Sequence, residues 1–431
     1  MVPQSLYVII AGKPAGVLSQ DATGVITFRY FDDYDGIPLS IRMPTGNTVY
    51  RQEVIKPYLF GLLPDDEAQR KAIARDFGCR PNNPVALLSH IGLDCPGAVQ
   101  FCEANAEALR TAIQRVGSYV RLSEGDIARR LRSIRSSDGD SWIAQGERWS
   151  LAGNQGKFAL ALHEGQWCAC HGSAATTHIF KNGVVGYSLQ ALNEYVCMRT
   201  ATRCGVIAAD VSYRFFENEP ALIITRYDRV ERQQSTYRLH QEDLCQALGV
   251  YPDQKYTSDG GPTTYDVLGL LAATGANATA NLRTFTEQLF FNYLIGAPDA
   301  HAKNYSLILS AGNSSALAPL YDVASGLAYE GMARKGRLAM AIGGENRFMR
   351  VGRTALERYA GARSAKVAEA MRTAGLDYDG CKETILALAR RIPPAMEEVF
   401  EEAIVGMGEL REHLLPPIRE SCEAAVRMLG E

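Results

Sequence analysis

The residues with the clearest chemical potential lie close together in residues 296–309, which read GAPDAHAKNYSLIL. Asp299 and Asn304 are five positions apart, the spacing of the hydroxyl-orienting aspartate and the metal-binding asparagine in a protein-kinase catalytic loop. Lys303 lies between them and could neutralise charge that develops on a transferred phosphoryl group. His301 takes the position where protein kinases usually carry lysine. The simpler alternative is a turn after a helix, with Asn304 as a cap and Lys303 in solvent.

Three residues outside this segment extend the pattern. Asp322 follows an apolar run in LAPLYDVAS, where protein kinases carry the metal-binding aspartate of Asp-Phe-Gly, although the triplet here is Asp-Val-Ala. Lys181 ends the strand-like segment THIFK, and Glu194 lies in the helix expected after it. In kinases a helical glutamate holds such a lysine against the nucleotide phosphates. The alternative for Asp322 is a buried aspartate that caps a turn. The alternative for Lys181 and Glu194 is that both are ordinary surface residues.

A glycine-containing segment, SLAGNQGK at residues 150–157, comes before these residues. Gly153 and Gly156 would let backbone N–H groups approach a polyphosphate. The segment is not a Walker A loop, because its glycines are only three positions apart and Lys157 precedes Phe158 instead of serine or threonine. Taken by itself it favours a hairpin turn. The order of all these parts along the chain nevertheless makes phosphoryl transfer the leading interpretation.

The elements that must position these residues divide the chain into a β-containing first half and a helical second half. Short β-branched and aromatic runs predict strands, and apolar residues at helical spacing predict helices. Ser123 and Asp126 form a variant capping box at the start of a helix, and residues 132–142 are polar enough for a linker. The expected strands include residues 149–152, 158–163, 177–180 and 221–229. The expected helices include residues 189–201, 281–294, 382–391, 395–407 and 420–429.

The composition is that of a soluble globular protein with more than one lobe. The chain has 431 residues, of which 46% are hydrophobic and 22% charged, and a net charge of −3. That charge gives no general nucleic-acid footprint. No apolar run is long enough for a membrane span, and the first residues lack the features of a signal peptide, so we expect a cytoplasmic protein without a membrane partner. Its ten cysteines are expected to be reduced thiols, and we expect no metal at the CACH cluster of residues 168–171.

Several segments together resemble the HipA family, bacterial serine/threonine-protein kinase toxins of type II toxin–antitoxin systems. They are SLAGNQGK, THIFK, ITRYDR, QEDLCQALGVYPDQKY with DGGP, FNYLIGAPDAHAKNYSL, LAPLYDVAS and MAIGGENR. The resemblance covers most of the chain and implies an α+β, two-lobed protein-kinase-like fold. Residues 1–140 would be an extra N-terminal β-rich subdomain, residues 141–240 the nucleotide-binding part of the N-terminal lobe, and residues 241–431 the mostly helical C-terminal lobe.

The resemblance also implies roles for single residues around ATP and Mg²⁺. Asp299 would be the catalytic base or hydroxyl-orienting acid, supported by His301 and Lys303. Asn304 and Asp322 would hold Mg²⁺.

Further residues would contact the nucleotide. Lys181 would bind ATP phosphates, with Glu194 in support. The flexible loop over the nucleotide would comprise Ala152, Gly153, Asn154, Gln155, Gly156 and Lys157. The hinge beside adenine would comprise Thr225, Arg226 and Tyr227.

Ser150 matches the position that HipA kinases autophosphorylate. A phosphoserine would add roughly −1.5 to −2 charges beside a loop that receives ATP phosphates, so repulsion would eject the loop and switch the kinase off. Two departures from the family lie near the site. Gly156-Lys157-Phe158 replaces the common Glu-Lys-Thr, which makes the loop more mobile, and Pro298 stiffens the approach to Asp299.

The resemblance implies partners as well as an activity. A HipB-like helix-turn-helix antitoxin would neutralise the toxin, and operator DNA would be bound mainly through that antitoxin. The protein substrate would be translation-related, for example an aminoacyl-tRNA synthetase such as glutamyl-tRNA synthetase. Two alternatives stay open: a small-molecule phosphotransferase of kinase-like fold, and a mainly co-repressor role in an antitoxin–DNA complex.

Overall fold

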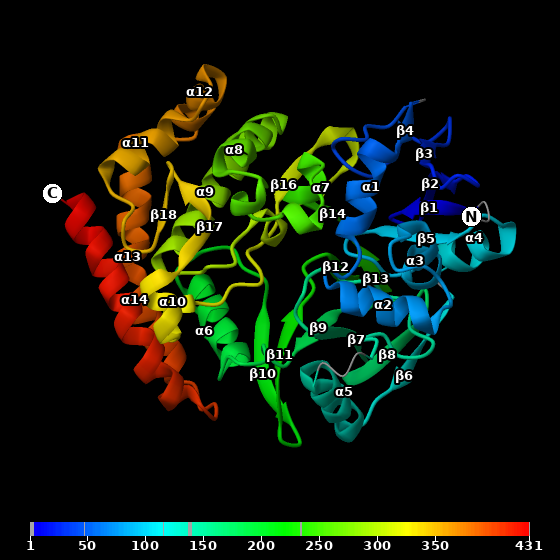
Figure 1. Cartoon of the computed structure of the whole chain (residues 1–431), viewed down its shortest axis with the longest axis horizontal. Helices are drawn as coiled ribbons and strands as arrows, with labels where there is room; N and C mark the ends of the chain where they lie inside the picture. The colour runs from blue at the N-terminus through cyan, green and yellow to red at the C-terminus, as the bar shows by residue number, and fades with distance from the viewer. Residues whose placement is uncertain (1–3, 47, 115, 137–139, 233–234, 431) are drawn as a thin grey trace. The chain divides into compact units, whose positions relative to one another are not determined.

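The computed structural model describes residues 4–46, 48–114, 116–136, 140–232 and 235–430. The chain forms two compact units, each assembled from separate stretches of sequence. Unit 1 comprises Met1–Val185, Phe215–Asp253 and Leu307–Asn313, and unit 2 comprises Gly186–Arg214, Gln254–Ser306 and Ser314–Glu431. Unit 1 is rich in strands and unit 2 is largely helical, which confirms the α+β class (Figure 1). The division at residues 140 and 240 stays a prediction.

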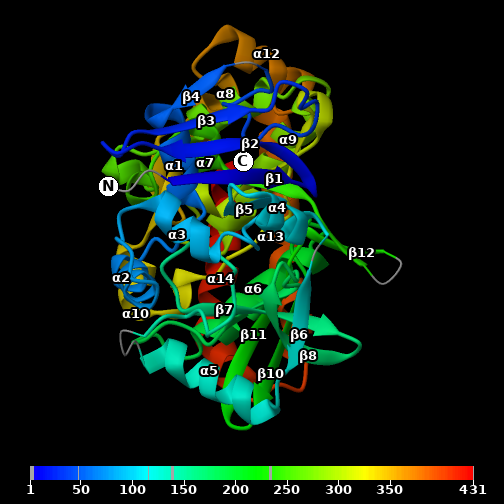
Figure 2. The same ribbon diagram turned by 90° about the vertical axis from the view of Figure 1, so that its right-hand side faces the viewer.

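The first sheet of unit 1 is antiparallel and has the strand order β4-β3-β2-β1-β5 (Figure 2). Leu6, Val8 and Ile10 alternate along β1 and are all buried, as expected for one face of a strand that packs against a core. Helices α1 and α3 contact this sheet. Its strands are β1 (Gln4–Ile10), β2 (Lys13–Gln20), β3 (Ile26–Tyr30), β4 (Val49–Arg51) and β5 (Val99–Glu103). The helices around it are α1 (Gln52–Gly61), α2 (Glu67–Asp76), α3 (Pro84–Ile91) and α4 (Ala106–Ile113).

The second sheet of unit 1 carries the glycine-rich segment at the start of one of its central strands. Within the unit the strand order is β11-β9-β7-β8-β6. The strands are β6 (Gly117–Arg121), β7 (Lys157–His163), β8 (Gln166–Gly172), β9 (His178–Lys181) and β11 (Glu219–Thr225). β10 (Val211–Phe216) begins in unit 2 and ends in unit 1. The remaining elements are α5 (Glu124–Ser136), β12 (Arg229–Arg232), β13 (Ser235–Arg238), β14 (His240–Asp243) and α7 (Leu244–Leu248).

Unit 2 is organised around α13 (Tyr378–Phe400), which packs against α6 (Gln190–Arg203), α9 (Ala278–Leu294), α11 (Arg353–Gly361) and α14 (Met407–Gly430). Both views show α13 and α14 side by side (Figures 1 and 2). Ile385, Leu388, Ile392 and Met396 recur at helical spacing along α13 and are buried. The other elements are α8 (Thr264–Ala272), α10 (Glu330–Lys335), α12 (Ala365–Thr373), β16 (Ser315–Leu317), β17 (Arg337–Ile342) and β18 (Glu345–Arg347). β15 (Ser306–Leu309) runs from unit 2 into unit 1.

Local signals in the sequence were confirmed where a few neighbouring residues decide the structure. The capping box at α5 is present, because the Ser123 amide donates to Asp126 Oδ2 at 2.8 Å and the Asp126 amide donates to Ser123 Oγ at 3.2 Å. The linker at residues 132–142 was wrong in its first part, since α5 continues to Ser136; residues 137–139 lie outside the described residues. Polar residues in that part are the solvated face of the helix.

Two further sequence interpretations were wrong. Residues 149–152 form no strand: Trp149 makes an isolated bridge to Asp94 and Gly153 makes another to Pro64, so this segment bonds to separate loops. The helix expected at residues 382–391 and the first part of the one expected at 395–407 form one helix, α13, which continues through Pro393 and Pro394 and ends at Phe400, while Met407 begins α14. Proline disfavours a helix interior, but the buried apolar stripe on either side keeps α13 continuous.

Among the described residues, none of the helices has the length and apolar character needed to cross a bilayer.

Candidate active site

The segment around Asp299 forms a closed loop after α9. Gly296 takes a left-handed φ of 62°, which turns the chain away from the helix. The His301 amide and the Asn304 side-chain nitrogen both donate to the Asp299 carbonyl oxygen at 2.8 Å, and the Asn304 amide donates to the His301 carbonyl at 2.9 Å. The Asp299 side chain is 63% exposed, whereas His301, Lys303 and Asn304 are buried. The loop therefore presents one carboxylate on a rigid base.

Two aromatic side chains meet at this carboxylate. The Tyr256 hydroxyl donates to Asp299 Oδ1, and the Tyr256 ring lies edge-on to the His301 ring with centroids 4.8 Å apart. His301 Nε2 is 3.7 Å from Asp299 Oδ1. Burial lowers the pKa of His301 to about 4, so its imidazole is neutral near pH 7. Sequence reasoning missed Tyr256, although QKY and DGGP stood out as a motif without an assigned role.

Asp322 is held beside this loop by the residue that precedes it. The Tyr321 hydroxyl donates to the Lys303 carbonyl at 2.9 Å and shares a 2.7 Å hydrogen bond with the Ser306 hydroxyl. Asp322 itself has a φ of 59°, a left-handed conformation that few residues other than glycine adopt. Strained backbone of this kind persists where the surroundings fix it, and it is frequent at functional sites. Asp299 and Asn304 thus share one loop, and the neighbour of Asp322 bonds to that loop within unit 2.

Helix α6 fixes the segment after Asp322. Asn193 donates from Nδ2 to the Ser325 carbonyl at 2.8 Å and accepts at Oδ1 from the Ser325 amide at 3.0 Å. The Ser325 hydroxyl donates to the Ile295 carbonyl at 2.5 Å, just before the catalytic loop begins. Glu194, the predicted supporting glutamate, is the next residue of α6 and is buried. Asn193 was not singled out from the sequence, because an asparagine within a helix carries no local signal.

In unit 1 the glycine-rich segment is folded back on its own backbone. Ser150 is fully buried, and its hydroxyl donates to the Leu62 carbonyl oxygen. Lys157 Nζ donates to the Ala152 carbonyl at 2.8 Å, which closes the loop between them. Gly153 has a φ of 102°, and a Cβ at that position would lie 2.6 Å from Lys157 Nζ. Glycine at this position therefore allows the lysine to reach across the loop.

Lys157 and Lys181 are directly opposite each other in the antiparallel register of β7 and β9. Directly opposed residues of an antiparallel pair project from the same face with Cβ atoms roughly 5 Å apart. Both lysines are buried. The register therefore places two of the predicted phosphate-binding residues side by side in unit 1, and their binding of phosphate stays a prediction.

The predicted hinge, Thr225 to Tyr227, is held by a buried ionic cluster. Arg226 donates to both carboxylate oxygens of Asp228, from Nε at 3.0 Å and from Nη2 at 2.9 Å, and its backbone amide donates to the Thr177 carbonyl. Its guanidinium is therefore occupied within the protein, and any contact that the hinge makes to adenine must use other groups. Burial acts to raise the pKa of Asp94, but Arg229, Arg238 and Arg226 hold it well below its usual range. The cluster consists of Asp94, Arg226, Asp228, Arg229 and Arg238.

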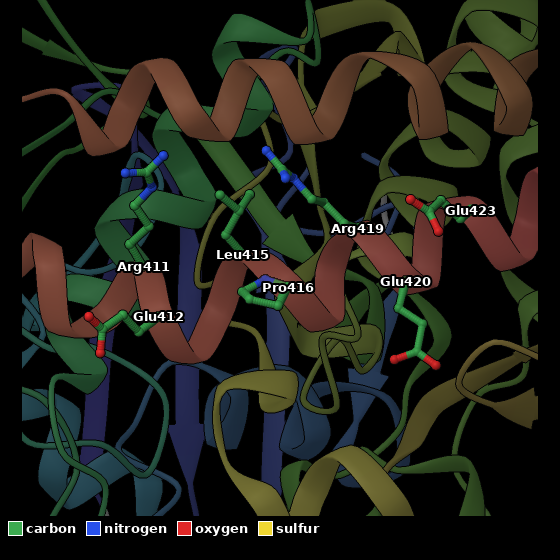
Figure 3. A pocket seen from close by; sticks show the side chains of 7 residues that line it. All are labelled: Arg411, Glu412, Leu415, Pro416, Arg419, Glu420 and Glu423. Carbon is green, nitrogen blue, oxygen red and sulfur yellow. The ribbon is translucent and has the colours of Figure 1, made fainter.

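A separate groove of about 590 Å³ lies along α14 (Figure 3). Arg411 and Arg419 point from α14 towards α13, where both pair with Glu397 at 3.3 and 2.5 Å. The side chains of Glu412 and Glu420 point away from α13 in this view. Since both arginines pair with Glu397 of the neighbouring helix, we interpret the groove as part of the packing of α14 on α13.

Two protein-family models match this chain, one in its N-terminal region and one in its central and C-terminal region. The model described as HipA-like C-terminal domain matches residues 149–396, and the model described as HipA N-terminal domain matches residues 6–102. The chain belongs to the HipA family. This HipA-family chain is 35% identical over 339 residues to Y4mE of Sinorhizobium fredii, a protein that is named as a kinase, with 77% of this chain and 79% of that protein covered. It is 29% identical over 400 residues to the serine/threonine-protein kinase toxin HipA of Shewanella oneidensis, with 89% and 87% covered.

A solved structure supports the same conclusion for the fold. The HipA chain in a complex of HipA, HipB and operator DNA from Shewanella oneidensis MR-1 superposes with a TM-score of 0.81 at 26% identity, over 99% of this chain and 97% of that chain. The HipA-family chain therefore has the expected kinase-like fold with an additional N-terminal subdomain. Its relatives are named as kinases, and a kinase family implies ATP and a divalent metal.

Asn304 and Asp322 have the oxygen-bearing side chains that a divalent metal beside ATP requires. Mg²⁺ prefers oxygen ligands and usually takes only one or two carboxylates from the protein, together with substrate phosphates and water. The nitrogen of the Asn304 amide bonds to the Asp299 carbonyl, which leaves its oxygen as the atom for a metal. Asp322 supplies a carboxylate. No group of three or more histidine, cysteine, aspartate or glutamate side chains in the described parts of the chain is arranged to hold a metal. The donor set therefore suits Mg²⁺ bound together with a nucleotide.

Proposed function

We propose that this protein is a toxin that acts as an ATP- and Mg²⁺-dependent serine/threonine kinase. The observation that carries the proposal is the arrangement in unit 2. An exposed Asp299 carboxylate stands on a loop that also fixes Asn304, and hydrogen bonds from Tyr321 and Asn193 hold the backbone on either side of Asp322. These are the positions at which a kinase needs a hydroxyl-orienting acid and two metal ligands.

Each residue has a distinct task in this proposal. Mg²⁺, when bound, neutralises charge on the phosphates of ATP. Asp299 accepts the hydrogen bond of the attacking serine or threonine hydroxyl and orients its oxygen towards the γ-phosphorus. Asn304 and Asp322 hold the metal through oxygen atoms, and Lys303 stabilises negative charge on the transferred group. His301 is neutral and supports the loop.

The nucleotide contacts proposed for unit 1 follow the same logic. Lys181 and Lys157 bind phosphate oxygens, and Glu194 is the residue expected to support Lys181. Backbone groups of the loop at residues 152–157 surround the phosphates. Adenine is bound beside the hinge at residues 225–227, where the Arg226 side chain keeps the backbone rigid.

Ser150 is the proposed site of autophosphorylation. Its hydroxyl is buried and bonded to Leu62, so the segment must open before the hydroxyl can receive a phosphoryl group. A phosphoserine carries roughly −1.5 to −2 charges and does not fit back into this uncharged position. Phosphorylation would thus hold the loop open and switch the kinase off.

The proposed partners are a HipB-like antitoxin and, through it, operator DNA. Support comes from the similar structure, a Shewanella oneidensis complex of HipA with HipB and operator DNA. The net charge of −3 favours DNA contact mainly through the antitoxin. A translation-related substrate, for example an aminoacyl-tRNA synthetase such as glutamyl-tRNA synthetase, rests on the family resemblance.

The test compares wild type with Asp299→Gln, and uses Asp379→Asn, an exposed aspartate at the start of α13, as a matched control. Purified protein with radiolabelled ATP and Mg²⁺ should incorporate phosphate at Ser150 in wild type and in the control, but not in the Asp299 variant. Phosphoproteomics of cells that express each protein should reveal a substrate site with wild type and control alone. Transfer to a small molecule without protein labelling would favour a small-molecule phosphotransferase. Repression with an inert kinase would favour a co-repressor.

A further inference from the structure

The DGGP motif forms a turn that closes on Tyr256. The amides of Asp259 and Gly261 both donate to the Tyr256 carbonyl, at 3.0 and 2.9 Å, and the Thr257 hydroxyl donates to the Pro262 carbonyl at 2.7 Å. A Cβ on Gly261 would lie 1.9 Å from the Gln254 carbonyl oxygen, so only glycine fits there. The turn therefore fixes the backbone of Tyr256.

The side chain of Tyr256 is fixed as well. The buried His301 ring packs against the Tyr256 ring, with an angle of 79° between the two ring planes. The Lys255 ammonium lies 5.6 Å from the centre of the Tyr256 ring. His301 itself is buried and belongs to the same loop as Asp299. With the ring held in this way, the hydroxyl reaches Asp299 Oδ1 from a fixed direction.

We propose that Tyr256 is a positioning residue that holds Oδ1 of Asp299 and thereby turns Oδ2 towards the substrate hydroxyl. The inference rests on the proposed kinase function. A carboxylate that is 63% exposed has little packing to fix it, and rotation about its terminal bond is soft. A hydrogen bond from a rigid phenol selects one orientation before substrate arrives. Correct orientation of a reacting group lowers the barrier of the chemical step, so the effect should appear in kcat.

The kinetic test is Tyr256→Phe in the full-length chain, which keeps the ring against His301 and removes only the hydroxyl. We expect kcat for phosphoryl transfer to fall about 10- to 100-fold, while KM for ATP changes less than twofold. The matched control is Tyr265→Phe, because the Tyr265 hydroxyl donates to the Arg358 carbonyl instead of a carboxylate. It should retain the wild-type kcat. A Tyr256→Phe protein with wild-type kcat would overturn the inference.

A second measurement needs no activity. Unfolding free energies of wild type, Tyr256→Phe, Asp299→Ala and the double variant form a thermodynamic cycle, with alanine chosen because asparagine would keep an oxygen that accepts from Tyr256. If the hydroxyl bonds to Asp299, the loss in the double variant should differ from the sum of the two single losses, and additive losses would overturn the inference. A wild-type protein that never transfers phosphate from ATP would refute the kinase, and the positioning role with it. An active wild type with additive losses, or with an unaffected Tyr256→Phe protein, refutes the role of Tyr256 alone.

Discussion

Asn193 bonds twice to the backbone of Ser325, once as a donor at 2.8 Å and once as an acceptor at 3.0 Å. The two residues are 132 positions apart, so the pair joins α6 to the segment that follows Asp322. Because an amide side chain can donate and accept at once, it satisfies both polar groups of one backbone residue. Glu194 and Asp322, both proposed to act on the nucleotide and its metal, are thereby tied to a common point.

Replacing Asn193 with leucine should therefore impair both stability and transfer. The change leaves the buried amide and carbonyl of Ser325 without their side-chain partner. Each lost partner lowers the free energy of unfolding by up to about 3 kcal/mol. We expect kcat to fall at least tenfold. Thr202→Ala is the control on the same helix, because the Thr202 hydroxyl donates to the Met198 carbonyl within α6 at 3.3 Å. Urea denaturation and phosphate incorporation measure the two effects, and a stable, fully active Asn193→Leu protein would contradict this interpretation.

Ser150→Ala should separate autophosphorylation from folding. The substitution removes a buried hydroxyl that donates to Leu62, so we expect a loss of about 1 kcal/mol in unfolding free energy. Ser173→Ala is matched, since the buried Ser173 hydroxyl also donates to a backbone carbonyl, that of Val116. Only Ser150→Ala should abolish phosphate incorporation into the chain and prolong ATP binding. Continued labelling of the Ser150→Ala protein would place the modification elsewhere.

The sequence revealed those parts of the site that are local. Asp299 and Asn304 belong to one short loop, so their spacing alone indicates their relation. Lys157 and Lys181 were predicted from a glycine-containing segment and from a strand-like segment that ends in lysine, and their role stays a prediction. Contacts between distant segments left no such signal. Tyr256 reaches Asp299 across 43 positions, and Asn193 reaches Ser325 across 132.

Arg226 shows that a residue's position along the chain does not reveal its side-chain partners. It was predicted to lie in the nucleotide-binding hinge, which stays a prediction, and its guanidinium bonds to Asp228, Thr176 and the Cys95 carbonyl within the core. Most arginines are exposed, and nothing in ITRYDR shows that two aspartates, one of them Asp94, surround this one. The prolines of α13 make a similar point, because packing of the whole helix outweighs a local tendency to break it.

His301 should tolerate an apolar replacement in folding but not in catalysis. Within the described part of the chain, both of its ring nitrogens are buried without a hydrogen-bond partner, which disfavours the folded state. His301→Leu should therefore keep or raise the melting temperature while phosphoryl transfer falls at least tenfold. His240→Leu is the contrasting variant, since His240 is buried with its ring nitrogens bonded to the Leu39 carbonyl at 3.0 Å and the Ala98 amide at 3.4 Å. That variant should melt lower. Full activity of His301→Leu would limit His301 to packing.

Glu242 should give the stability of the protein a measurable dependence on pH. Burial raises the pKa of Glu242 to about 8, although the Ile41 amide donates to its Oε1 at 2.8 Å. In the unfolded chain this carboxyl titrates near 4.5. Between these values the folded protein keeps a proton that the unfolded chain has released, so stability falls as pH rises, by at most about 1.4 kcal/mol per pH unit.

A comparison with Glu242→Gln isolates this effect. Burial lowers the pKa of His240 and of His301 to about 4 and also lowers that of His90, so these histidines add stability as pH rises through about 6.5, equally in both proteins. Melting temperatures measured from pH 6.5 to 8 should fall for wild type relative to Glu242→Gln, which cannot ionise and keeps an oxygen for the Ile41 amide. The curves should therefore diverge with rising pH, with the variant more stable at pH 8. Parallel curves would mean that Glu242 ionises in the folded protein at its ordinary pKa, and that its burial is relieved by a partner.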